Sequence, residues 1–115
     1  MENKFWKCPV KVRRGTYEEM PESWIGAAVS YYVGAATDED ALSKAVSVLE
    51  SQGMEFVALL GGQVIQLDPA EWWDGYVMTN YAEYSEHFPD QDAVYNVVLE
   101  GDIFHGPFAG WEAPA

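Results

Sequence analysis

The chain of 115 residues is long enough to bury a core, and its 49% hydrophobic and 15% aromatic content argues against a disordered protein. Its 19 acidic residues against six lysines and arginines give a formal net charge of −13. A field of this sign repels nucleic acids and anionic membranes and attracts cationic proteins. We therefore expect a basic protein partner, no direct contact with nucleic acid and no membrane association.

The charges and the one cysteine set further limits. Five of the six cations lie within the first fourteen residues, and only Lys44 follows them. Cys8 stands alone, so an intramolecular disulfide is excluded and a reducing, cytoplasmic location is favoured. The first residues carry charge and no apolar run reaches the roughly 20 residues of a membrane span, so neither a signal peptide nor a membrane helix is expected.

The first third of the chain predicts two strands. Residues 5–14 alternate apolar and basic side chains, with Pro9 favouring an edge or an irregular start. Residues 15–23 are typical of a loop. Residues 24–36 are apolar, β-branched and aromatic, which indicates a central strand with close packing at Gly26 and Gly34.

A helix of about residues 38–52 follows. Thr37 or Asp38 can cap it, and acidic residues occupy its first turn, where the helix dipole favours them. Gly53 is a natural end. One apolar stripe is expected from Leu42, Ala45, Val46 and Leu49.

The middle of the chain predicts a hairpin and a short helix. Residues 54–60 and 63–67 flank Gly61-Gly62, and two strands joined by two glycines are typical of a β-hairpin. Asp68 before Pro69 is a typical helix start, and this helix is expected to end at Gly75.

For the last third we predict mainly strands. Residues 76–81 are interpreted as a strand, and residues 82–92 as a loop or a brief helix closed by Pro89. Residues 93–108 are interpreted as two strands around Glu100-Gly101-Asp102, and residues 109–115 as a loose tail.

Together these elements predict a single α+β domain over residues 1–115, with a mainly antiparallel sheet and one long helix packed on a face. The order strand, helix, strand is also compatible with a ferredoxin-like arrangement, in which residues 24–36 and 54–60 would lie parallel.

Enzymatic chemistry is not indicated. The only histidines are His87 and His105, and no G-x-S-x-G, cysteine–histidine or phosphate-binding glycine motif is present. No H-x-x-x-H or CxxC pair suggests a metal site, and the carboxylates lack the spacing of a calcium-binding loop. We expect no enzyme, no cofactor and no dedicated metal.

The segment EWWDGYVMTNYAEYSEHFPDQD, residues 71–92, carries six acidic and six large aromatic residues and no lysine or arginine. Aromatic side chains are favoured anchors at protein interfaces, and surrounding acids accelerate association with a cationic surface. The other interpretation is that the rings form the core and the acids an ordinary solvated face; of Trp72 and Trp73, we expect one in the core and one partly exposed. The candidate partner-binding residues are Glu71, Trp72, Trp73, Asp74, Tyr81, Glu83, Tyr84, Glu86, Asp90 and Asp92.

The chain resembles bacterial immunity proteins of contact-dependent or polymorphic toxin systems. The resemblance lies in its small size, its acidity and this segment, above all Glu71-Trp72-Trp73-Asp74 and residues 81–92. The resemblance implies a cytosolic, non-enzymatic protein that neutralises one cognate toxin, such as a basic nuclease. Two other hypotheses stay open. One is an acidic DNA mimic that blocks a nucleic-acid-binding protein, and the other is a small accessory or ligand-binding domain with a concave aromatic site.

Overall fold

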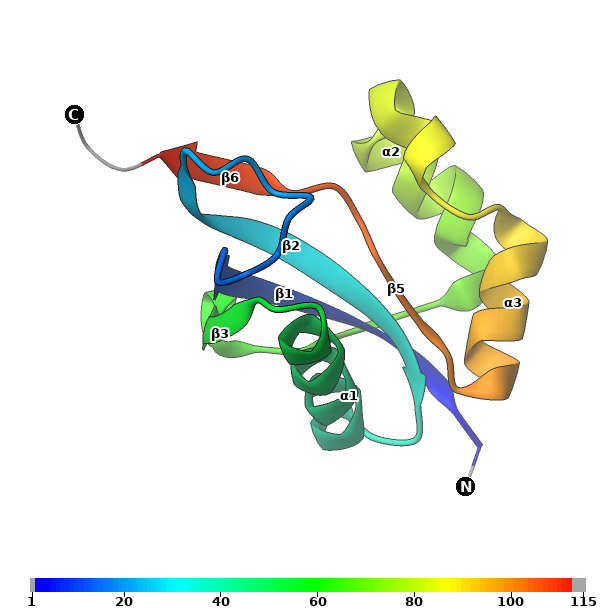
Figure 1. Cartoon of the computed structure of the whole chain (residues 1–115). Coiled ribbons are helices and arrows are strands. Elements are labelled where there is room, and N and C mark those ends of the chain that lie inside the picture. Colours follow the sequence, from blue (N-terminus) through cyan, green and yellow to red (C-terminus); the bar gives the residue numbers. More distant parts are fainter. Residues whose placement is uncertain (1, 113–115) are drawn as a thin grey trace.

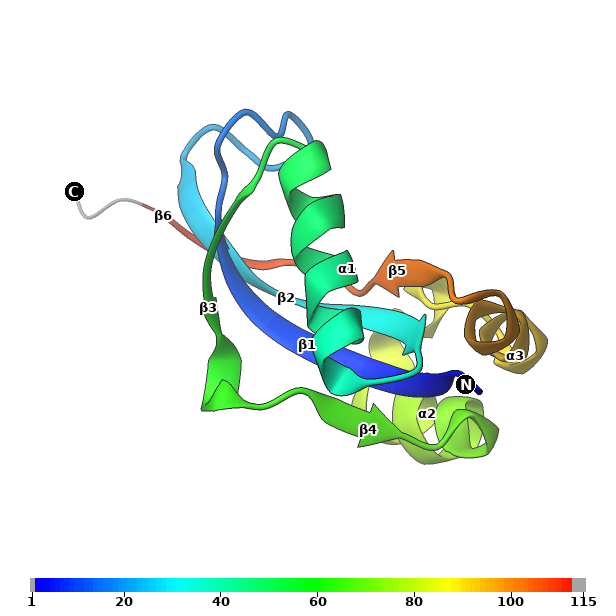
Figure 2. The ribbon, with the colours of Figure 1, turned by 90° about the horizontal axis from the view of Figure 1, so that it is seen from below.

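In the computed structural model, which describes residues 2–112, a curved antiparallel sheet of six strands carries helices on both of its faces (Figures 1 and 2). The predicted α+β class is therefore confirmed. The order along the sheet is β3-β1-β2-β5, with β4 also paired to β1 and β6 also paired to β2. The strands are β1 (Lys4–Arg13), β2 (Trp24–Ala35), β3 (Glu55–Leu59), β4 (Ile65–Leu67), β5 (Ile103–His105) and β6 (Ala109–Glu112).

The two long central strands give the sheet two different faces. β1 and β2 pair from Lys4 opposite Ala35 to Arg13 opposite Gly26. Because successive side chains of a strand point to opposite faces, the apolar residues of each strand divide between two cores. Cys8, Val10 and Val12 of β1 belong to the first core, whereas Phe5 belongs to the second.

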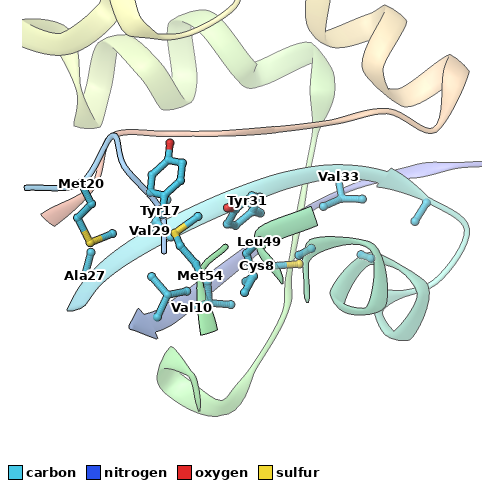
Figure 3. Close-up of a cluster of buried hydrophobic side chains, with 14 residues drawn as sticks. Cys8, Val10, Tyr17, Met20, Ala27, Val29, Tyr31, Val33, Leu49 and Met54 are labelled. Atoms are coloured by element: carbon cyan, nitrogen blue, oxygen red, sulfur yellow. The ribbon is translucent and has the colours of Figure 1, made fainter. Parts of the chain in front are cut away.

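Helix α1 (Asp38–Ser51) covers the first face, as Figure 2 shows. Of the two predicted cap candidates, Thr37 is the one that caps it, since its hydroxyl accepts a hydrogen bond from the Asp40 backbone N–H at 3.2 Å. The fully buried side of α1 is formed by Ala41, Ala45 and Leu49, a face rotated slightly from the expected stripe. Figure 3 shows side chains of this core, including Cys8, Val10, Tyr31, Leu49 and Met54.

Residues 69–100, here called the helical segment, cover the second face (Figure 1). The expectation of one long helix is therefore wrong, because the sheet has a helical layer on each side. Short turns of different pitch come first and a regular helix closes the segment. Its parts are η2 (Pro69–Glu71), the π-helical turn η3 (Trp72–Val77), α2 (Met78–Asn80), η4 (Ala82–His87) and α3 (Gln91–Glu100).

The Gly61-Gly62 turn does not make a hairpin. Both glycines have positive φ and lie in a short 3₁₀ turn, η1 (Leu60–Gly62), but β3 and β4 each pair antiparallel with β1. The ten-residue strand β1 offers one edge long enough for both segments in succession, so they lie end to end along it. β2 and β3 are each antiparallel to β1, which lies between them, so they run in the same direction without pairing with each other. The order β3-β1-β2-β5, with β4 and β6 added to the central strands, nevertheless does not confirm a ferredoxin-like arrangement.

Residues 93–100 form a helix where strands were expected. Asp90 is the N-cap of α3, accepting from the Ala93 N–H at 2.8 Å, and Gly101 ends the helix in the left-handed conformation. Val94, Val97 and Val98 share one side of this helix and pack on the second core, and that packing overrides their β propensity. The predicted close packing at Gly34 is confirmed, since a Cβ there would collide with the Val97 carbonyl oxygen.

Two further predictions need correction. The short helix starts after Asp68 as expected, but it passes Gly75 and continues to Asn80, so residues 76–81 are not a strand. Residues 109–112 form β6 on the edge of β2, not a loose tail. The remainder of the predicted tail, residues 113–115, lies outside the described residues.

Candidate partner-binding surface

Trp72 is the centre of the second core and fixes the helical segment on the sheet. Its side chain is 1% exposed, and its indole N–H donates to the Pro89 carbonyl oxygen at 2.8 Å. Its ring centroid lies between 5.1 and 5.7 Å from those of its aromatic neighbours. With Trp72, the aromatic cluster consists of Phe5, Tyr32, Tyr76, Tyr81, Phe88 and Phe104.

The hydroxyl oxygens of Tyr32 and Tyr76 lie 2.7 Å apart and connect β2 to the helical segment. Burial raises the pKa of both phenols above the usual value, so both stay neutral at physiological pH. The Lys7 ammonium nitrogen lies 5.3 Å from the Tyr76 ring centroid, in a cation–π contact. One cation of the basic N-terminal strand is thus engaged with the aromatic cluster.

A side-chain clamp joins the start of α3 to the start of the helical segment. The Gln91 amide oxygen accepts from the Trp73 backbone N–H at 3.0 Å, and its amide nitrogen donates to the Pro69 carbonyl oxygen. Together with the Trp72–Pro89 bond, this clamp holds residues 69–73 against residues 89–91. Carboxylates more than fifteen residues apart in the chain are therefore carried by one connected unit.

The structure divides the ten candidate residues between core and surface. Trp72 is buried and is not available to a partner, because the sheet and the helical segment enclose it. Trp73 and Tyr81 are half-buried against the cluster, whereas the Tyr84 side chain is 52% exposed. The expectation that one tryptophan lies in the core and the other is partly exposed is confirmed. All six carboxylates are exposed and are here called the acidic surface: Glu71, Asp74, Glu83, Glu86, Asp90 and Asp92.

Within the described residues, no lysine or arginine lies within salt-bridge distance of the acidic surface. Its one ion pair joins the Glu86 carboxylate to the His87 imidazole, with Oε1 and Nε2 3.7 Å apart, and both side chains are largely exposed. Lys44, the only cation after Arg14 in the sequence, donates to the carbonyl oxygens of Gly34 and Gly101 at 3.1 Å. The negative charge of the acidic surface is therefore largely uncompensated.

Three of these carboxylate positions also have a structural role. Asp90 caps α3, and Asp92 stands in the first turn of the same helix, where the dipole favours negative charge. The Glu71 side chain packs so closely under Gly75 that a Cβ there would lie 2.9 Å from its carboxylate oxygen. The presence of an acid at these positions is thus explained in part by helix formation alone.

Sequence reasoning missed two adjoining clefts beside the acidic surface. The first, of about 380 Å³, lies between the sheet and Tyr81, Tyr84 and Phe108, with Ser30 among its polar groups. The second, of about 310 Å³, shares Tyr84 and Phe108 and is also lined by His87 and His105. The His105 Nδ1 atom lies 2.8 Å from the Gly106 carbonyl oxygen, so Nδ1 carries the proton and donates. No local pattern indicates these clefts, because their walls come from distant segments.

Among the described residues, no group of three histidine, cysteine or carboxylate side chains is placed to hold a metal ion. The helices in the described part of the chain are too short or too polar to cross a membrane.

No family model, curated protein or solved structure matches this chain.

Proposed function

We propose that the protein binds and neutralises a basic protein partner through the acidic surface. The observation that carries this proposal is the combination of six exposed carboxylates, with no lysine or arginine of residues 2–112 in salt-bridge distance, on a helical segment that Trp72 packs against the sheet and the Gln91 clamp ties together. A negative surface of this kind accelerates encounter with a cationic protein by about 10–10³-fold. The half-buried Trp73 and the exposed Tyr84 supply the aromatic contact that sustains a complex.

The Trp72–Pro89 bond and the Gln91 clamp hold the part of this surface around Glu71 and Asp90 in place, which supports inhibition over transient contact. Residues that are already held in place lose little conformational entropy when a partner docks, so more of the interaction energy becomes affinity. The carboxylates are also separated from the first core by the sheet. Substitutions on the acidic surface are therefore expected to change binding without unfolding the protein.

The partner that fits best is a toxin of the nuclease class. A nuclease must hold phosphates and so carries a cationic surface, which an acidic protein of this shape can cover. This is the role of an immunity protein of a bacterial contact-dependent or polymorphic toxin system, acting in the cytoplasm without enzymatic activity. Resemblance to that class supports the proposal through size, acidity and the composition of residues 71–92.

The test is co-purification of the tagged chain from its native host at low salt, followed by mass spectrometry. The double variant Glu83→Lys/Glu86→Lys is compared with Glu18→Lys/Glu22→Lys, which makes the same charge change at exposed positions in the loop between β1 and β2. We expect a basic protein that is retained by the wild type and the loop variant and lost by the surface variant. Equal retention by both variants would move the interface elsewhere, and a captured nucleic-acid-binding protein that is not a toxin would favour the DNA-mimic hypothesis.

A second candidate function, binding of a small ligand, is favoured by the two adjoining clefts. Their combined lining of Tyr81, Tyr84, Phe108, Ser30 and His105 offers apolar walls with a few polar groups, as ligand sites do. Flat aromatic fragments titrated into labelled protein should shift the amide resonances of Ser30 and Phe108 if this function is present. Resonances that do not move at saturating fragment would remove the candidate.

A further inference from the structure

The outer edge of β3 is open. β3 is the terminal strand of the order β3-β1-β2-β5, and along its other side no strand pairs within residues 2–112. Four of its five residues are exposed. An open edge presents unpaired backbone N–H and C=O groups, which form a template for another strand.

This edge lacks most of the usual protection against pairing. Residues 56–67, which run from β3 through η1 to β4, contain no charged residue and no proline. Exposed apolar side chains follow one another along it: Phe56, Val57, Leu60 and Ile65. Two protective devices remain. One is the exposed charge of Glu55 at the start of β3, and the other is the register shift where Val12 and Lys11 of β1 face Phe56 and Ala58, which leaves Val57 as an extra residue. The opposite edge, by contrast, carries Pro107 between β5 and β6, and proline cannot donate to a ladder.

We propose that the β3 edge pairs antiparallel with β3 of a second copy of this chain, about a two-fold axis at Val57. Such a contact is self-complementary, because each copy offers the other the same strand. The axis places Val57 of one copy opposite Val57 of the other, and Glu55 of each copy opposite Leu59 of the other. The two Glu55 carboxylates therefore do not face each other. The two sheets join into one continuous sheet across the axis.

The uncharged, apolar character of residues 56–67 suits a second copy better than the basic partner proposed above. Two chains of net charge −13 repel each other over most approaches, and the uncharged edge at residues 56–67 is where that repulsion is weakest. A basic protein, by contrast, gains no electrostatic attraction at an uncharged edge. β3 contributes no residue to the acidic surface, so pairing there gives a dimer with two open acidic surfaces. The inference goes beyond the proposed function and does not depend on it.

Salt separates the two kinds of association. Screening weakens attraction between the acidic surface and a basic partner, but it also weakens repulsion between two copies of this chain. We therefore expect self-association to strengthen as ionic strength rises, in the direction opposite to partner binding. This sign difference makes failure of the dimer distinguishable from failure of the proposed function.

The experiment is sedimentation equilibrium of the full chain over a series of concentrations at low and high salt. The apparent mass of the wild type is expected to approach twice the 12.9 kDa of one chain as protein concentration rises. At high salt it should do so at a lower protein concentration than at low salt. Val57→Glu places two like charges across the axis and is expected to raise the dimer dissociation constant at least about tenfold. The matched control is Ile25→Glu on β2, an exposed apolar residue in the same shallow cleft as Val57 but away from the edge, which should still dimerise.

Amide hydrogen exchange of the wild type provides a readout that needs no variant. The backbone amides of Phe56–Ala58 that point away from β1 should exchange more slowly at concentrations where the dimer forms. A wild type that stays monomeric at every concentration and salt, or a folded Val57→Glu that dimerises as the wild type does, would overturn the proposal. Equal loss of the dimer in Ile25→Glu would place the contact outside the β3 edge and overturn it as well.

Discussion

The hydroxyl oxygens of Tyr32 and Tyr76 lie 2.7 Å apart, and this hydrogen bond joins a central strand of the sheet to the helical segment that carries the acidic surface. Substituting either tyrosine by phenylalanine leaves the other hydroxyl without this partner. We expect each single substitution to lower the free energy of unfolding by about 1 kcal/mol. A double-mutant cycle with both phenylalanines should give a favourable coupling of about 0.5 kcal/mol or more. Strictly additive effects would mean that the bond does not hold the two layers together.

Trp72 and Trp73 are adjacent, yet their substitutions should have opposite signatures. Trp72→Ala removes the centre of the aromatic cluster and is expected to cost about 3–5 kcal/mol of unfolding free energy. Trp73→Ala is expected to weaken partner binding by about 2 kcal/mol or more with a much smaller effect on unfolding. Denaturant titration and binding calorimetry on the same preparations separate the two. A Trp73→Ala protein that loses stability but keeps full affinity would assign this side chain to the core alone.

Asp90 combines a helix cap with a surface charge, and two substitutions separate these roles. Asp90→Ala removes the hydrogen bond to the Ala93 N–H and should lower stability by about 1 kcal/mol. Asp90→Asn keeps a capping oxygen and removes the charge, so its unfolding free energy should stay near that of the wild type while its association with a basic partner slows. If asparagine destabilises as much as alanine, charge at the helix start, and not capping, is the stabilising feature.

Alkaline pH should destabilise the protein through its buried acids. Burial raises the pKa of the Cys8 thiol from 9.0 to about 12. Well below pH 9 the Cys8 thiol is protonated in both the folded and the unfolded chain. Above pH 9 the unfolded chain loses the thiol proton, whereas the folded chain keeps it up to about pH 12. The free energy of unfolding therefore falls as pH rises through this range. The contribution is about 1.4 kcal/mol per pH unit for one group. Urea titrations should give Cys8→Ala a shallower loss than the wild type between pH 9 and 10, and identical slopes would show that the thiol is not shielded from water.

The sequence predicts those elements whose ends carry local chemistry. Thr37 caps α1 and Asp68 starts the helical segment as expected, because a side-chain oxygen there satisfies a backbone N–H whatever the rest of the fold does. The strand prediction for residues 93–100 fails because Val94, Val97 and Val98 favour strands by composition, whereas their spacing of three and four residues suits a helix packed on rings. Asp90 after Pro89 was the available sign of a helix start.

Long-range pairing explains the remaining differences. The Gly61-Gly62 turn has the backbone that its sequence indicates, but whether two strands pair with each other or both with β1 depends on a segment fifty residues away. The same holds for the candidate surface. The exposed carboxylates are predictable from composition, whereas the burial of Trp72 and the clefts lined by Tyr84 and Phe108 depend on which segments the fold brings together.

The most direct test of the acidic surface is the association rate with the co-purified partner, measured by stopped-flow fluorescence over a range of ionic strength. We expect the wild-type rate to fall steeply as salt rises, and the Glu83→Lys/Glu86→Lys variant to associate more slowly with a weaker dependence on salt. The Glu18→Lys/Glu22→Lys loop variant should keep a rate closer to that of the wild type. A wild-type rate that is flat from low to high ionic strength would contradict binding driven by this surface.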